Sequence, residues 1–145
     1  MQSMTAQLVR DFLVSPEDYL EGELHTEVKH EYLAGVVHAM AGARNVHNDI
    51  SGNVFLSLGI QLRGKPCRPC NSDTKVRLRL PTGLRFYYPD AQVTCQPNPP
   101  TDSYQDQPIV VVEVCIVASY AIPGTSCAWG CLRKSGIIAG RVFWR

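Results

Sequence analysis

One apolar run with a carboxylate inside it constrains this chain more than any other stretch. Residues 109–114 read Ile-Val-Val-Val-Glu-Val, a run continuous enough in valine to predict a strand buried on both faces. Glu113 is the charged residue of this run. Because an ionised carboxylate is costly to bury without a positive partner, the run predicts either a neutralised structural acid or a cation site.

A second strand is predicted over residues 87–95, where Asp90 directly follows Pro89. Two such strands side by side would aim the oxygens of Asp90 and Glu113 at one point. Mg²⁺ is held in this way, by one or two carboxylates with water and phosphate in the remaining positions. The pair therefore predicts a Mg²⁺ (or Mn²⁺) site that places the ion against a scissile phosphate and lowers the pKa of an attacking water. The alternative stays open that Asp90 is a turn acid and Glu113 a buried acid neutralised by Lys or Arg.

The remaining patterns alternate between helix and strand. Ser15 and Pro16 predict a helix start, and Gly35 predicts a bend between two short strands. Residues 45–62 repeat apolar side chains every fourth position, which predicts a long helix that Asn45 can cap. Residues 75–80 alternate apolar and basic side chains, which predicts a half-buried strand with a basic outer face. This order predicts an α/β fold with helices packed on a mixed sheet.

Composition limits the class of protein. The 145 residues suit one domain, and a net charge of +1 gives no global field to recruit nucleic acid, so any such binding must come from local basic patches. Neither a membrane-spanning run nor a signal-peptide pattern is present, so we expect a cytoplasmic protein with no membrane partner. We therefore expect the six cysteines to be reduced thiols.

The cysteines offer one alternative, a small zinc-binding module. It would use the pairs Cys67 with Cys70 and Cys127 with Cys131. The span between the pairs is far longer than in zinc fingers, which favours unrelated thiols.

Composition changes abruptly near residue 114. All 13 acidic residues lie at or before Glu113, and both tryptophans lie in residues 115–145. We divide the chain into a core, residues 1–114, and an atypical tail, residues 115–145. Either a divergent tail or a reading-frame change just after Val114 explains the shift, and we favour the frame change. The coding DNA tests this: an alternative frame should restore a Ser-Pro-Ser-Thr-like run and a downstream Lys.

A set of short motifs follows one another along the chain, at residues 15–20, 30–40, 45–48, 64–68, 72–76, 88–94 and 108–114. In this order, the motifs resemble the Uma-two family of restriction endonucleases within the PD-(D/E)XK superfamily. The family has an acid where this chain has Ala34.

This resemblance implies a restriction-endonuclease-like mixed sheet flanked by helices, truncated at its C-terminus if the frame has changed. It also implies Mg²⁺-dependent hydrolysis of DNA, with Asp90 and Glu113 as metal ligands and Glu31 as a further catalytic acid. Superfamily members often pair to cut both strands, so a homodimer is the expectation by analogy.

One element of the superfamily site is missing. A Lys is expected two residues after the Glu, where this chain has Cys115. Lys75 is the best local substitute, with the alternative that it is a solvated lysine beside Arg77 and Arg79. These two arginines could hold phosphates, and His47 could contact substrate or be a polar partner for backbone. A non-catalytic nucleic-acid-binding or structural remnant of the fold therefore stays open as the rival function.

Overall fold

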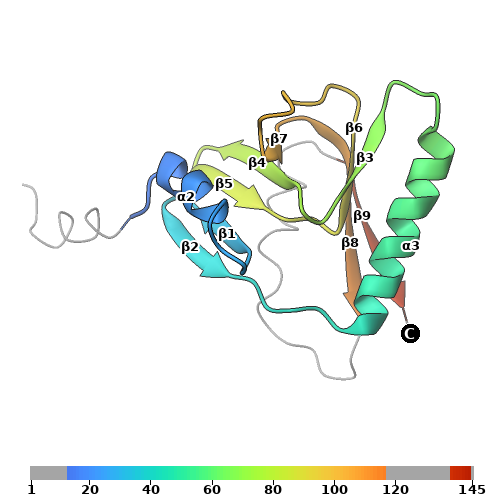
Figure 1. The fold of residues 1–145 in the computed structure, drawn as a ribbon, viewed down its shortest axis with the longest axis horizontal. Helices are drawn as coiled ribbons and strands as arrows, with labels where there is room; N and C mark the ends of the chain where they lie inside the picture. Colours follow the sequence, from blue (N-terminus) through green and yellow to red (C-terminus); the bar gives the residue numbers. More distant parts are fainter. Residues whose placement is uncertain (1–12, 117–137, 145) are drawn as a thin grey trace, which may run out of the picture.

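The computed structural model describes residues 13–116 and the backbone of residues 138–144. Helices and strands both occur along the chain, and Figure 1 shows helices α2 and α3 on opposite sides of the described part of the chain. No helix in the described part of the chain is long and apolar enough to cross a membrane. The elements are α2 (Pro16–Glu23), β1 (His30–Leu33), β2 (Val36–Ala39), α3 (Asn45–Leu62), β3 (Arg68–Asn71), β4 (Lys75–Leu80), β5 (Gly83–Tyr87), β6 (Ala91–Thr94), β7 (Tyr104–Gln105), β8 (Pro108–Ile116) and β9 (Ile138–Trp144).

The strands form two sheets. Sheet A has the order β2-β1-β5-β4-β7, and sheet B has the order β3-β6-β8-β9. Each sheet is mixed, because β7 joins β4 in parallel and β9 joins β8 in parallel while the other pairs are antiparallel. The predicted α/β class with a mixed sheet is confirmed, with the strands shared between two sheets.

Helix α2 begins where the sequence predicts. Ser15 is its N-cap, and the Ser15 hydroxyl accepts a hydrogen bond of 3.0 Å from the backbone N–H of Asp18. The helix ends at Glu23. It packs Tyr19 against Tyr32 and Phe86 of sheet A, with ring centroids 5.1 Å and 5.4 Å from the Tyr19 ring.

The predicted strand over residues 87–95 is wrong in one respect. Tyr87 ends β5 in sheet A, Ala91 begins β6 in sheet B, and residues 88–90 pass from one sheet to the other. Pro89 lies in this passage. Because proline has no backbone N–H, it cannot donate a hydrogen bond to a neighbouring strand, and outside a strand none is required. The chain therefore changes sheets immediately before Asp90.

The two sheets share a hydrophobic core. Val76, Leu78 and Tyr87 of sheet A pack with Val111 of sheet B, and each of these side chains is at most 3% exposed. Leu33 packs against the same cluster. The inner faces of both sheets are thus defined by these residues.

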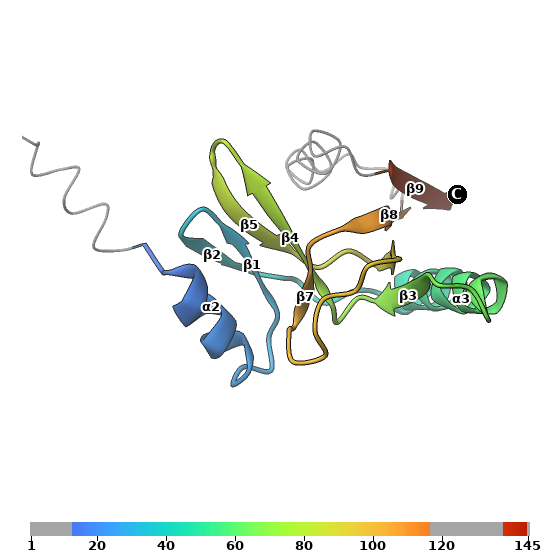
Figure 2. The same ribbon diagram turned by 90° about the horizontal axis from the view of Figure 1, so that it is seen from above.

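Helix α3 covers sheet B, as both views show (Figures 1 and 2). The predicted apolar stripe is its inner face, since its members are partly buried while Leu56 and Ile60 outside the stripe are exposed. Asn45 is the first helical residue, and Arg44 rather than Asn45 is the N-cap, without a side-chain capping bond. The members of the stripe are Val46, Ile50, Val54, Phe55, Leu58 and Leu62.

Strand β9 lies within the predicted tail. It pairs with β8 in parallel from Val110↔Ile138 to Ile116↔Trp144. Residues 117–137 lie outside the described residues, and the division of the chain at residue 114 stays a prediction.

The expectation of reduced thiols is wrong for two cysteines. Cys67 and Cys95 form a disulfide, and they lie one step beyond the Arg68↔Thr94 pair of β3 and β6. Antiparallel neighbours at such a position bring their Cβ atoms close enough to be bridged. A disulfide-bonded Cys67 cannot supply the thiolate that the zinc alternative requires, while Cys127 and Cys131 lie outside the described residues.

The disulfide predicts a specific labelling pattern. A thiol-reactive maleimide added without reductant should leave Cys67 and Cys95 unlabelled while it labels Cys70, as read by tandem mass spectrometry that assigns the label to individual residues. Reduction should lower the free energy of unfolding by roughly 3 kcal/mol, because the bond closes a loop of intermediate length. Cys70→Ser is the matched control and should not change the effect of reduction. Labelling of Cys67 before reduction would contradict the prediction.

Candidate active site

Asp90 stands at the junction of the two sheets. Its Oδ2 atom accepts a hydrogen bond of 2.6 Å from the backbone N–H of Val114 in β8. Its side chain is 14% exposed, so the carboxylate is largely withdrawn from water but still reachable. The bond fixes this carboxylate against the strand that carries Glu113.

Glu113 lies on the strand that pairs with β6 just after Asp90. The antiparallel register of β6 and β8 ends with the pair Ala91↔Val112, so Asp90 directly precedes this pair on one chain segment and Glu113 directly follows it on the other. Glu113 shares the face of β8 that carries Val111, because side chains two residues apart point the same way. It is half-buried and takes part in a polar or electrostatic interaction. The predicted pairing of these two strands is therefore present.

Glu31 faces the same interior from sheet A. It shares the face of β1 with Leu33, which packs on the cluster around Val111, whereas Tyr32 points to the opposite face and contacts Tyr19. Burial raises the pKa of the Glu31 carboxyl. An acid kept in such a desolvated place is a recurrent feature of functional sites.

His47 lies against Asp90. It belongs to the first turn of α3, and its Nε2 atom is 3.2 Å from Asp90 Oδ1. Its Nδ1 atom is buried and has no hydrogen-bond partner in the described part of the chain. The structure thus brings His47 into contact with Asp90, and it places Glu113 on the strand whose Val114 N–H bonds Asp90, with Glu31 on the facing sheet.

Lys75 lies away from the corner of Asp90 and Glu113, on the other face of sheet A. The alternative of a solvated lysine is wrong, because the residue is only 3% exposed. Its Nζ atom donates to Ser103 Oγ at 3.3 Å and lies 5.0 Å from the centroid of the Tyr88 ring. It occupies the face of β4 opposite to Val76, and therefore points away from the inner face that carries Glu113. Burial lowers its pKa, while nearby Glu23 opposes that shift.

The two predicted phosphate-binding arginines differ from each other. Arg77 forms a two-pronged pair with Asp106, from Nε to Oδ1 at 2.5 Å and from Nη2 to Oδ2 at 2.7 Å. Its Nη1 atom also donates to the Tyr104 hydroxyl at 3.0 Å. Arg79 is exposed. Arg79 is thus the one of the two whose guanidinium solvent can reach freely.

The candidate residues carry the donor type that a hard divalent cation prefers. Asp90 and Glu113 have carboxylate oxygens, the ligands that suit Mg²⁺ and Mn²⁺, and Glu31 has a further carboxylate on the facing sheet. No three His, Cys, Asp or Glu side chains among the described residues are grouped so as to hold an ion by themselves. A Mg²⁺ site built on two carboxylates would take its remaining ligands from water and substrate phosphate.

Sequence reasoning missed a polar cluster beside this corner. The Glu23 side chain is only 4% exposed, and its Oε2 atom accepts a hydrogen bond of 2.6 Å from the Tyr88 hydroxyl. Its Oε1 atom is 2.8 Å from Nδ1 of His30. The signal that could have found it is the place of Tyr88, directly before Pro89 and Asp90.

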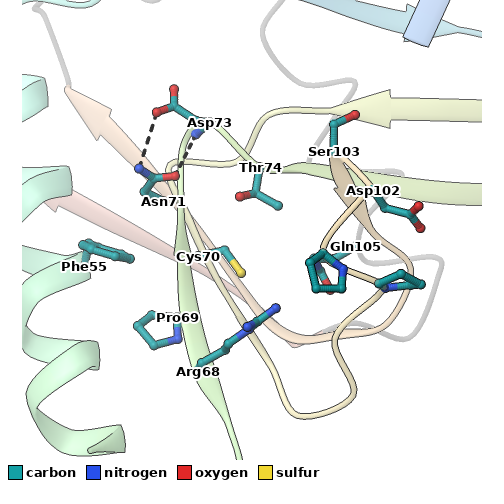
Figure 3. A pocket seen from close by; sticks show the side chains of 12 residues that line it. Phe55, Arg68, Pro69, Cys70, Asn71, Asp73, Thr74, Asp102, Ser103 and Gln105 are labelled. Atoms are coloured by element: carbon teal, nitrogen blue, oxygen red, sulfur yellow. Dashed lines mark hydrogen bonds between the residues drawn. The ribbon is translucent and has the colours of Figure 1, made fainter. Parts of the chain in front are cut away.

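A separate cavity of about 440 Å³ lies along β3, between α3 and the loop before β7 (Figure 3). Its wall includes the free thiol Cys70 and, from the end of β3, Asn71, whose strand partner is Ala91. None of the predicted catalytic residues lines it, so it is distinct from the carboxylate corner. Its lining side chains are Phe55, Arg68, Pro69, Cys70, Asn71, Asp73, Thr74, Pro99, Pro100, Asp102, Ser103 and Gln105.

The raised pKa of Glu31 predicts how stability depends on pH. At neutral pH, Glu31→Gln should raise the free energy of unfolding, because it removes a charge that burial disfavours. The gain should be complete above the raised pKa, shrink as the pH falls through it, and disappear below the ordinary value of 4.5. Urea unfolding of the metal-free protein across this range measures it. Exposed Glu27→Gln is the control, and a gain that increases on acidification would contradict the assignment.

Comparison with known proteins bears on this site. The sequence model of the Uma2 family, described as "Putative restriction endonuclease", matches residues 16–117. An uncharacterized protein of Synechocystis sp. is 34% identical over 102 residues, which cover 70% of this chain and 53% of that protein. The chain therefore spans about half the length of the curated relative it matches. No solved structure matches the chain.

Proposed function

Because this chain belongs to the Uma2 family of restriction endonucleases, we propose that it has the site of a divalent-metal-dependent DNA nuclease at the Asp90–Glu113 corner. The observation that carries the proposal is the hydrogen bond from Val114 N–H to Asp90 Oδ2, which holds one acid against the strand of the other. Two carboxylates fixed in this way, beside a third on the facing sheet, are the donors that Mg²⁺ needs.

Each residue has a separate role in the proposed reaction. Asp90 and Glu113 hold the ion, which when bound polarises the phosphate and lowers the pKa of the attacking water. Glu31 adds negative charge on the opposite wall. His47 orients Asp90 through the 3.2 Å contact between Nε2 and Oδ1. Exposed Arg79 can contact the DNA backbone, which positions a duplex without reading its sequence.

The proposed site lacks one catalytic component. Cys115 occupies the position two residues after Glu113, where the superfamily has a Lys that orients water and compensates charge in the transition state. Lys75 does not replace it in this arrangement, since its ammonium is bound to Ser103 on the other face of sheet A. We therefore infer that the chain as written binds metal but cleaves DNA slowly.

The absence of the superfamily Lys also favours a second function. With the Lys replaced by Cys115, and with the family match ending at residue 117, the chain can retain the fold and bind nucleic acid without cutting it. A change of reading frame after Val114 would produce such a remnant. Cleavage and binding assays on the same preparation distinguish the two functions.

Metal binding tests the carboxylate pair. Asp90→Asn should weaken Mn²⁺ affinity by at least about 10-fold, because the site keeps too few hard ligands. Titration calorimetry measures the affinity. Asp49→Asn, an exposed acid on α3, is the matched control and should bind Mn²⁺ like the wild type. Equal affinity of the Asp90→Asn variant and the wild type would exclude Asp90 as a ligand.

Activity is expected to be low. Loss of one charge-stabilising group typically lowers a rate by ~10²–10³, so we expect only slow nicking of supercoiled plasmid in Mg²⁺. Glu113→Gln should abolish what remains. Fast nicking that Glu113→Gln abolishes would contradict this expectation. Lys75→Met, which keeps the buried stem without the charge, would then test whether Lys75 is the missing base.

A further inference from the structure

The carboxylate of Glu23, the last residue of α2, receives hydrogen bonds from two distant parts of the chain. The Tyr88 hydroxyl donates to Oε2 at 2.6 Å. The backbone N–H of His30 also donates to Oε2, at 3.2 Å, and His30 Nδ1 lies 2.8 Å from Oε1. Since an ionised carboxylate can only accept, Nδ1 is the donor in that contact. One buried carboxylate therefore joins the start of β1 to the passage between the sheets.

These two partners flank two acids of the proposed site. His30 directly precedes Glu31, and Tyr88 lies two residues before Asp90. Glu31 lies in β1 of sheet A and Asp90 lies just before β6 of sheet B, so no shared strand ladder sets the spacing between them. The Glu23 carboxylate is a direct polar link between the segments that carry them.

Tyr88 is held in place by contacts of its side chain. Residues 88–90 belong to neither β5 nor β6, and Pro89 has no N–H to donate. Two ammonium groups lie over the Tyr88 ring, with Lys75 Nζ at 5.0 Å and Lys29 Nζ at 5.4 Å from its centroid. The hydroxyl at the end of the ring meets Glu23. Removal of the hydroxyl alone would leave the ring packed but free to shift.

We propose that Glu23 is a positioning residue for the metal site: through His30 and Tyr88 it sets the separation of Glu31 and Asp90. The inference rests on the proposed function, since it concerns the same cation. Outer groups that orient metal-binding carboxylates commonly change metal affinity by 10–100-fold when they are removed. A purely structural role for Glu23 would change stability and leave the affinity of the folded protein unchanged.

The experiment compares Mn²⁺ affinity in folded variants of the full chain. Electron paramagnetic resonance measures free Mn²⁺ directly, and circular dichroism with urea unfolding reports the folded fraction. Tyr88→Phe removes only the hydroxyl and should weaken Mn²⁺ binding about 10-fold. Glu23→Gln should weaken it at least as much, because both bonded segments lose a charged acceptor. If Glu23→Gln does not fold, Tyr88→Phe alone decides the result.

Asp106→Asn is the matched control. It removes the charge of a carboxylate that is also held by several donors, from Arg77 and Asn98, but that has no link to residues 88–90. It should lower stability and leave Mn²⁺ affinity within about twofold of the wild type.

The outcomes separate the inference from the function on which it rests. Wild-type affinity in Tyr88→Phe, together with weakened binding in Asp90→Asn, would overturn the positioning role and leave the proposed function intact. Wild-type affinity in Asp90→Asn, or no Mn²⁺ binding by the wild type, would overturn both. Weakened binding in Asp106→Asn as large as in Tyr88→Phe would show a general effect of destabilisation and would also overturn the positioning role.

Discussion

The hydrogen bond from Val114 N–H to the Asp90 carboxylate is the interaction on which the arrangement of this protein depends. It closes the corner where the chain leaves sheet A and enters sheet B, and it lies beside the core in which Tyr87 packs with Val111. Without a fixed corner, the two inner faces would have no defined separation. The same residues therefore set both the packing of the core and the positions of the acids.

Charge inside this fold is stabilised where donors surround it. Glu23, whose side chain is 4% exposed, accepts from Tyr88 and His30. Burying such a carboxylate without these partners would cost several kcal/mol. Asp106 accepts from Arg77 and Asn98 and remains 31% exposed. Glu31 differs, because burial raises the pKa of its carboxyl.

Up to Glu113 the candidate site residues follow the family pattern, and after Glu113 they depart from it. The family match ends at residue 117, and Cys115 stands where the superfamily has its Lys. The structure nevertheless continues sheet B with β9 beside β8. A parallel partner on that edge supports the strand that carries Glu113. The sheet is therefore continued in a chain that has Cys115 where the superfamily has its Lys.

The sequence by itself determined the α/β class, the start of α2, the inner stripe of α3 and the pairing of the strands that carry Asp90 and Glu113. These features follow from local periodicity, capping and β-branched runs, which act over a few residues. Tertiary structure alone decided the passage between two sheets at residues 88–90, the disulfide of Cys67 with Cys95, and the burial of Lys75. The link from Glu23 to Tyr88 belongs to the same group. Each depends on contacts between segments far apart in the chain, because alternation along a strand shows that a side chain changes face but not what covers that face.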